Sequence, residues 1–199
     1  ELLKSQGLVD TLYVIGPTTC FFSWINEIKK VIPRELHYKI LAGGDRKNRR
    51  ANYYPTDDKL EMYISSFQTL TNDIEHVNKF LLNENVKPFI VIDEAHYIKR
   101  LNGQWSNAAL CLSKLSEYKC ILTGTPMPRA YGDLYNIFYF LWPENEAISG
   151  STKSIITNND ADLQRELIST HLENDIGPLH YGVRKSELGL APQIMHPPV

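Results

Sequence analysis

The stretch "VIDEAHYIKR", residues 91–100, indicates both the fold class and the position of a site. Residues 89–92 form a short, continuous apolar run, which is typical of a strand that is buried on both faces. Two carboxylates, Asp93 and Glu94, follow directly, and His96 comes two residues later. In open α/β sheets, ligands bind at the carboxyl ends of the strands. The stretch therefore predicts a buried parallel strand that delivers two acidic side chains to a ligand site.

Four other short apolar runs have the same character, and they alternate with segments whose apolar residues recur at helical spacing. The expected strands are 12–15, 38–41, 62–65 and 120–122, and the expected helices are 20–31, 73–82, 105–115, 131–141 and 163–172. Strands that alternate with helices form right-handed βαβ units. The sequence therefore predicts an α/β protein in three layers, an open and mostly parallel sheet with helices on both faces.

The composition limits the class of protein. The 199 residues are 43% hydrophobic and 11% aromatic, which suffices for a folded domain with a core. A net charge of −2 gives no general signal for nucleic-acid binding, so such binding would come from local basic clusters. Three scattered cysteines indicate neither a disulfide framework nor a zinc site. No apolar run approaches the ~20 residues of a membrane helix, so we expect a cytoplasmic protein with no membrane partner.

Two segments, 43–59 and 148–162, show neither the apolar runs of strands nor the apolar spacing of helices, and they are expected to be loops. The basic run 46–50 in the first of them is interpreted as a solvated loop in preference to a nucleic-acid contact. We expect a main domain over 1–147. The remainder, 148–199, is expected to consist of a loop, a helix and an extended, Pro-rich tail.

The acidic pair suits phosphate chemistry. One carboxylate can hold Mg²⁺ while the other takes a proton from an attacking water, as in nucleoside triphosphate hydrolysis. A solvated acidic turn is the alternative. The next strand is followed by "LTGTP", residues 122–126, at a distance of about 30 residues that suits one strand–helix–strand unit. The hydroxyls of Thr123 and Thr125 can hydrogen-bond to His96 or to a phosphate-bound water.

These stretches resemble motifs II and III of the superfamily 2 helicase-like ATPases and, more narrowly, of the Snf2 (SWI2/SNF2) family. "VIDEAHYIKR" is similar to the acidic box, and "CILTGTPMPRAYGDLYNIFYFLWP", residues 120–143, to the Thr-Gly-Thr-Pro box with its following helix. "LYVIGPTTCFFSWINEIKKVIP", residues 12–33, resembles motif Ia, and "YISSFQTL", residues 63–70, resembles motif Ib. The resemblance covers about 11–192 and implies a first RecA-like lobe.

The resemblance also implies roles for the acidic box and the threonines. Asp93 would coordinate Mg²⁺, and Asp93 and Glu94 together would face bound ATP. Glu94 would be the general base that activates water. His96, Thr123 and Thr125 would couple the state of the nucleotide to the nucleic-acid side.

The implied nucleic-acid partner is double-stranded DNA. Pro17, Thr18, Thr19 and Ser66 would contact its phosphates through backbone N–H groups and hydroxyls, without reading sequence. Lys99 and Arg100 would add positive charge, with a solvated turn as the alternative.

The phosphate loop G-x-x-x-x-G-K-[ST] does not occur in the sequence. In the family this loop precedes motif Ia, and a second lobe follows with arginine fingers. The chain is therefore expected to be a fragment, most of lobe one, that pairs with lobe 2 of the same polypeptide and does not hydrolyse ATP alone.

Two departures from the remodeller pattern, Arg100 and Pro128-Arg129, favour a bacterial or phage protein, whereas a eukaryotic one would be nuclear. Restriction, defence or remodelling subunits stay open as partners. The expected function is that of an ATP-dependent DNA translocase. A true superfamily 2 helicase or restriction-enzyme motor subunit is the first alternative, and a non-catalytic nucleic-acid-binding or scaffold module is the second.

Overall fold

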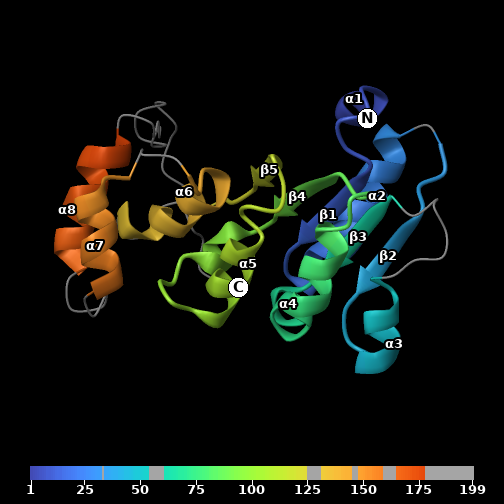
Figure 1. Cartoon of the computed structure of the whole chain (residues 1–199). Helices are drawn as coiled ribbons and strands as arrows, with labels where there is room; N and C mark the ends of the chain where they lie inside the picture. The colour runs from blue at the N-terminus through green and yellow to red at the C-terminus, as the bar shows by residue number, and fades with distance from the viewer. Residues whose placement is uncertain (33, 54–60, 125–130, 145–147, 159–164, 178–199) are drawn as a thin grey trace, which may run out of the picture. The chain divides into compact units, whose positions relative to one another are not determined.

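Five parallel strands form the sheet of the computed structural model (Figure 1). The structure describes residues 1–32, 34–53, 61–124, 131–144, 148–158 and 165–177. The strands are β1 (Thr11–Ile15), β2 (Tyr38–Leu41), β3 (Met62–Ser65), β4 (Pro88–Ile92) and β5 (Tyr118–Ile121). Their order in the sheet is β2-β3-β1-β4-β5, and each neighbouring pair is parallel. The predicted open α/β sheet is thereby confirmed.

The described helices fall into two compact units, Glu1–Asn145 and Glu146–Val199. The first contains α1 (Leu2–Ser5), α2 (Phe21–Val31), α3 (Arg46–Ala51), α4 (Phe67–Leu81), α5 (Gln104–Cys111), α6 (Tyr135–Leu141) and the 3-10 turns η1 (Thr18–Cys20), η2 (Ala95–Ile98) and η3 (Tyr131–Leu134). The second contains α7 (Gly150–Asn158) and α8 (Arg165–Ile176), joined where Thr152 Oγ1 donates to Asp175 Oδ2 at 2.6 Å. None of the helices in the described part of the chain has the length and apolarity that a membrane crossing requires.

Helices cover both faces of the sheet because successive strand side chains point in opposite directions. On one face, Val14 of β1 and Ile64 of β3 pack with Phe21 and Ile25 of α2. On the other face, the ring of Tyr63 lies 4.7 Å from that of Phe80 of α4, measured between centroids. The three predicted layers are therefore present in the first unit.

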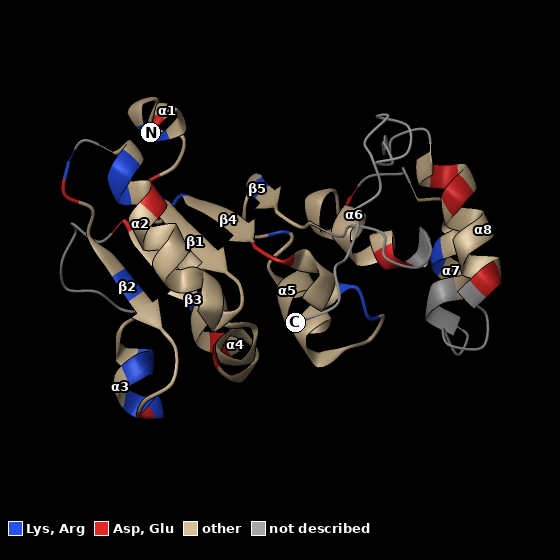
Figure 2. Ribbon diagram, turned by 180° about the vertical axis from the view of Figure 1, so that it is seen from behind, with Lys and Arg blue, Asp and Glu red and all other residues tan. Residues whose placement is uncertain are grey.

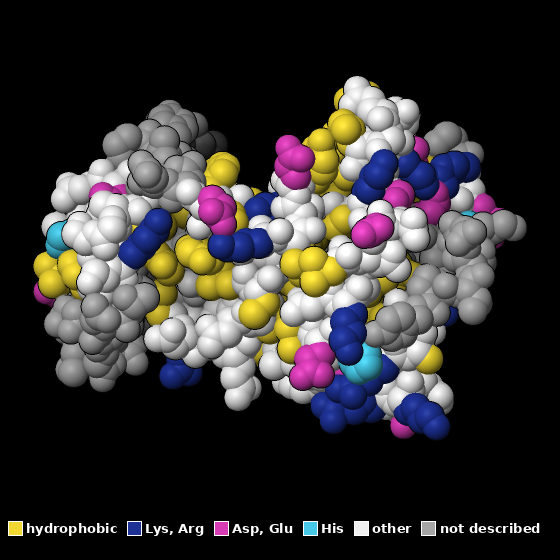
Figure 3. Space-filling model, in the orientation of Figure 1, with side chains coloured by type: hydrophobic (Ala, Val, Ile, Leu, Met, Phe, Trp, Pro, Cys, Tyr) yellow, Lys and Arg dark blue, Asp and Glu magenta, His cyan; other side chains and the backbone are white. Residues whose placement is uncertain are grey.

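Two segments that were expected to be loops contain helices. Helix α3 lies within 43–59 and begins at Asp45, whose Oδ2 accepts a hydrogen bond from the Asn48 N–H at 3.0 Å. It carries four basic residues, which colour much of its ribbon blue in Figure 2, and basic side chains gather on the surface over α3 in Figure 3. Helix α7 lies within 148–162. The prediction of irregular structure was wrong at both places, because neither helix has an apolar face that its sequence would reveal.

Helix α4 begins earlier than the predicted 73–82. Ser66 is its N-cap, and its Oγ accepts a hydrogen bond from the Thr69 N–H at 3.1 Å. The helix is interrupted at Asp73, whose φ of −118° and ψ of 15° are not helical. Phe67 and Leu70 are buried and continue the helical spacing of the later apolar residues, so the apolar pattern covers the whole helix and the prediction began it too late.

The strand ends lie in one row across the sheet. In the register of the sheet, Leu41 pairs with Ser65, Ser65 with Ile15, Ile15 with Ile92, and Ile92 with Ile121. Each of these five residues is the last of its strand. The segments that follow the strands therefore emerge at a common edge, and neighbouring segments are about 5 Å apart there.

Candidate functional site

Asp93 is fixed at this edge by contacts on several sides. Its backbone N–H donates to the Ile15 carbonyl at 2.7 Å, so the β1–β4 ladder continues one step beyond the strands. Its Oδ1 accepts from the Glu94 N–H at 2.9 Å, and its Oδ2 accepts from the Trp24 indole N–H at 2.8 Å. Gly16 faces it so closely that a Cβ added there would lie 3.2 Å from the Asp93 Cβ. The carboxylate is therefore held in one place at the carboxyl end of β4.

Glu94 turns the chain sharply after Asp93. Its φ of 51° and ψ of 50° are left-handed values that side chains other than glycine seldom adopt. Such backbone strain is concentrated at functional sites. The turn brings Glu94 Oε2 to 3.1 Å from His96 Nδ1, an ion-pair contact that lacks hydrogen-bond alignment. The predicted trio of Asp93, Glu94 and His96 is thus brought together by one tight turn.

The acidic turn is attached to the segment after β5. The Ala95 N–H donates to the Leu122 carbonyl at 3.0 Å, which places Thr123 next to the turn. Thr125, its predicted companion, lies outside the described residues.

The far end of the turn is held by Asn136 of α6. Its Nδ2 donates to the carbonyls of Ile98 at 2.6 Å and Arg100 at 3.1 Å. Asn136 is buried, at 2% exposure, and it was not among the residues expected from the sequence. Its position on an otherwise apolar helix face was the signal that a buried polar partner had to exist.

The predicted DNA contacts after β1 surround the same edge. Pro17 is the N-cap of η1, and its carbonyl accepts from the Cys20 N–H at 3.0 Å. Thr18 and Thr19 are exposed. Through the contact of Gly16 with Asp93, this segment and the acidic turn are neighbours. The structure thus groups Pro17, Thr18 and Thr19 with the acidic box.

Ser66, Lys99 and Arg100 lie apart from this group. Ser66 follows β3, on the side of β1 away from β4, and its hydroxyl is used by the cap of α4. Lys99 and Arg100 lie at the end of η2, and the Arg100 side chain is exposed. They share the edge of the sheet with the acidic box without touching its carboxylates in any contact of the described residues.

A match to a protein-family model identifies the family of the chain that carries this site. The model of the SNF2-related domain matches residues 3–169, most of the chain. The chain belongs to the SNF2-related family.

Individual relatives agree with this assignment. The SNF2-related chain is 32% identical over 148 residues to Helicase SWR1 of Mycosarcoma maydis, covering 72% of the chain and 7% of that protein. It is 26% identical over 191 residues to the chromatin-remodeling ATPase INO80 of Eremothecium gossypii, covering 86% of the chain and 13% of that protein. The chain thus spans a small part of the length of these relatives.

Solved structures confirm the fold. The SWI2/SNF2 ATPase core of Sulfolobus solfataricus in complex with dsDNA matches with a TM-score of 0.60 and 22% identity, over 88% of this chain and 34% of that one. The SWI2/SNF2 ATPase core domain of the same organism matches with a TM-score of 0.56 and 22% identity, over 96% of this chain and 37% of that one. The RecA-like lobe implied by the sequence is therefore confirmed as the fold of the SNF2-related chain.

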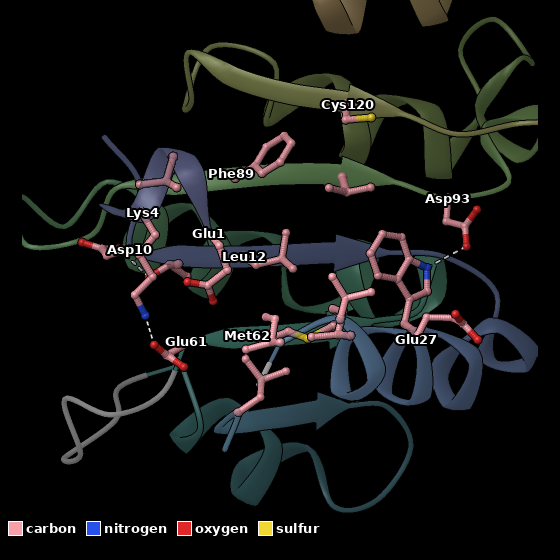
Figure 4. A pocket seen from close by; sticks show the side chains of 18 of the residues that line it. Glu1, Lys4, Asp10, Leu12, Glu27, Glu61, Met62, Phe89, Asp93 and Cys120 are labelled. Carbon is pink, nitrogen blue, oxygen red and sulfur yellow. Dashed lines mark hydrogen bonds and ion pairs between the residues drawn. The ribbon is translucent and has the colours of Figure 1, made fainter. Parts of the chain in front are cut away.

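A cavity of about 760 Å³ opens beside α2 of the SNF2-related chain (Figure 4). Its walls are largely apolar and include Leu12, Met62 and Phe89. At one end Lys4 pairs with Glu61, and at the other lies Asp93 with its hydrogen bond from Trp24. The apolar walls offer no donors to phosphates, so the polar groups of the cavity lie at its two ends, and Asp93 marks the end at the carboxyl edge of the sheet.

Cys20 lies at the same end and keeps its proton. Burial raises the pKa of its thiol, and the negative charge of Asp93 raises it further. The thiol therefore adds no second negative charge beside the carboxylate, and it is a poor nucleophile and metal ligand at neutral pH.

The donor set fits a cation that is shared with a ligand. No group of three or more His, Cys, Asp or Glu side chains that could enclose a metal ion occurs among the described residues. Mg²⁺ is usually held by one or two carboxylates together with substrate phosphates and waters. The Asp93 carboxylate accepts one N–H on each oxygen and a further hydrogen bond from the Cys20 thiol, which still leaves a lone pair, so Asp93 fits the role of a single protein ligand to Mg²⁺.

Proposed function

We propose that this chain supplies the hydrolytic acidic box and part of the DNA-binding edge of an ATP-dependent translocase of double-stranded DNA. The observation that carries the proposal is the fixed carboxylate of Asp93 beside the strained Glu94, at the carboxyl edge of a RecA-like sheet. Membership of the SNF2-related family gives this edge its context.

Asp93 would hold Mg²⁺, which neutralises developing charge on the transferred phosphoryl group when it is bound. Glu94 would accept the proton of the attacking water as general base. His96, whose Nδ1 lies 3.1 Å from Glu94 Oε2, would couple the state of the nucleotide to the nucleic-acid side. Thr123 and Thr125 would relate the occupancy of this site to the nucleic-acid side.

The segment Pro17, Thr18 and Thr19, with Ser66 and the cations Lys99 and Arg100, would follow the DNA backbone. The row of strand ends supports this, because Ser66 and Gly16 leave adjacent strands and Asp93 leaves the next. A surface about 10 Å across is thereby available to successive phosphates of one strand. The relative solved with dsDNA supports the choice of partner.

Two alternatives differ in what they predict. A true superfamily 2 helicase or a restriction-enzyme motor subunit would separate strands or depend on partner subunits, whereas a translocase displaces a third strand from a triplex without unwinding. A non-catalytic scaffold would bind DNA without turnover. The retention of Glu94 in a strained conformation favours catalysis, since binding alone gives no reason to hold a carboxylate there.

The proposal is tested by Glu94→Gln in the intact protein. We expect DNA-stimulated ATP hydrolysis to fall by about 100-fold or more, the usual worth of a general base, while nucleotide binding persists. The matched control is Glu117→Gln, an exposed carboxylate directly before β5 that should leave turnover unchanged. Turnover that persists in Glu94→Gln would exclude Glu94 as the base. The isolated 199-residue chain is expected to show no measurable hydrolysis.

A further inference from the structure

Trp24 connects α2 to the acidic turn through a single polar contact. Its Nε1 lies 2.8 Å from Asp93 Oδ2, across a separation of 69 residues in the sequence. The indole has one donor and no acceptor, and that donor is directed at a carboxylate oxygen. Trp24 is half-buried, and its ring packs against the core cluster formed by α2 and the sheet. The ring therefore has a packing role, and the N–H has a separate partner.

The hydrogen bond that the Asp93 carboxylate accepts from Glu94 does not fix it to the rest of the fold. Oδ1 accepts from the N–H of Glu94, the very next residue, so this bond moves with the turn. The indole belongs to a different element and is held by its own packing. Among the contacts of the described residues, the Trp24 N–H and the Cys20 thiol reach the Asp93 carboxylate from other elements, and the indole N–H is the stronger donor of the two. It determines the direction in which the remaining lone pairs of that carboxylate point.

We propose that Trp24 is a positioning residue that orients the Asp93 carboxylate for a divalent cation. The inference rests on the proposed function, because it takes Asp93 as the cation ligand. Carboxylates that bind metals are themselves held by hydrogen bonds, and loss of such a partner typically costs about 10-fold to 100-fold in metal affinity. A charge-assisted bond of this kind is also about twice as strong as a neutral one. Removing the N–H while keeping the ring should therefore weaken the cation site without emptying the core.

The test measures Mn²⁺ binding to the intact protein with a non-hydrolysable ATP analogue, by the electron paramagnetic resonance signal of free Mn²⁺, corrected for the Mn²⁺ that the same analogue binds without protein. Trp24→Phe should raise the dissociation constant of Mn²⁺ about 10-fold. A second variant carries the benzothiophene analogue of tryptophan at position 24, which keeps the shape of the ring and lacks the N–H. It should show the same shift with an unchanged melting temperature. Trp142→Phe, at a half-exposed tryptophan away from the site, is the matched control and should not shift.

The possible results separate the inference from the function beneath it. If Asp93→Asn abolishes Mn²⁺ binding and both position-24 variants weaken it, the inference holds. If Asp93→Asn abolishes Mn²⁺ binding but the position-24 variants keep a dissociation constant within about twofold of the parent, the expected ~10-fold rise is absent. The inference then fails, and the proposed function stands. A shift in Trp24→Phe that is absent from the benzothiophene variant would assign the effect to packing and overturn the inference. Unchanged binding in Asp93→Asn would refute the proposed function itself.

Discussion

A buried carboxylate, Asp73, attaches the basic helix α3 to α4. Its side chain has no exposed surface, and it accepts from Arg49 Nε at 2.6 Å and from Arg50 Nε at 3.0 Å, with Arg49 Nη2 at 3.3 Å. Arg50 Nη2 also donates to the Asn72 carbonyl at 3.0 Å. The backbone of α4 leaves helical geometry at Asp73. The attachment of α3 therefore depends on one acidic side chain in a distorted turn.

Asp73→Asn removes the charge and keeps the shape. The amide nitrogen would face guanidinium donors, so two cations would lose their counter-charge in a partly buried place. Removing one partner of a buried ion pair typically costs about 3–5 kcal/mol. Arg49 is 11% exposed and Arg50 is 32% exposed, so Arg50 recovers part of its hydration in the variant. We therefore expect a loss near the lower end, about 3 kcal/mol in the free energy of unfolding.

Thermal and urea denaturation measure this loss. For a protein of this size, about 3 kcal/mol corresponds to a fall of roughly 10 °C in melting temperature. The control is Glu75→Gln, the same change of charge at an exposed position on the same helix, which should stay within about 0.5 kcal/mol of the parent.

The pH dependence gives a second check on the same pair. Burial alone would raise the pKa of Asp73, but the hydrogen bonds and charges of Arg49 and Arg50 outweigh burial and hold the pKa below its usual 3.8. A carboxyl group with a lowered folded-state pKa contributes stability above its unfolded pKa and loses it as the pH falls through the folded value. The gap between parent and Asp73→Asn should thus be constant from pH 7 to pH 5 and shrink only below 3.8. A variant as stable as Glu75→Gln, or a gap that already closes at pH 5, would refute the account of this ion pair.

Two further substitutions test contacts at the edge of the sheet. Ser66→Ala should lower the free energy of unfolding by about 1 kcal/mol through loss of the α4 cap, whereas Ser66→Asp should preserve the cap and weaken duplex-DNA binding in fluorescence anisotropy by charge repulsion. Undiminished DNA binding by Ser66→Asp would place Ser66 outside the DNA surface. Asn136→Ala should cost about 2 kcal/mol in urea denaturation, because two carbonyls at the end of the acidic turn lose their donor, and the exposed Asn85→Ala serves as its control. Equal stability of these two variants would show that solvent replaces the amide.

The sheet was predictable because each strand is a short, largely apolar run, interrupted only by Lys39 in β2 and Lys119 in β5, and this pattern can be recognised without knowledge of the neighbouring strands. Helix α3 was not, because its six residues contain no apolar face and its stability comes from Asp73, more than 20 residues away. The same holds for α7, which begins next to Ser149, where Asp175 of α8 accepts the backbone N–H at 2.9 Å. Elements that are stabilised by a single distant polar group leave no periodic signal in the sequence.

In the candidate site, too, some features were predictable from the sequence and others were not. Asp93 and Glu94 were predictable as strand-end residues, since every parallel strand presents its carboxyl end at one edge. The contact of Trp24 with Asp93 was not, because helical spacing assigns Trp24 to the apolar face with Phe21 and Ile25, and an indole serves both purposes. Ser66 was predicted as a DNA contact from its resemblance to a motif, and its role as a helix cap emerged only from the geometry.

The segment proposed to contact DNA and the residue proposed to hold the cation lie close together in this fold. Strands β1 and β4 are neighbours, so the segment expected to meet DNA and the residue expected to hold the cation leave the sheet side by side. Three contacts join them: the close approach of Gly16 to Asp93, the hydrogen bond from the Cys20 thiol, and the hydrogen bond from Trp24, one turn into α2. A displacement of the start of α2 by a DNA backbone would therefore reach the Asp93 carboxylate without passing through the core. Coupling over one helical turn needs no extended network of residues. The hydrogen bond from the Trp24 N–H is then the contact that would break if the start of α2 moved away from Asp93.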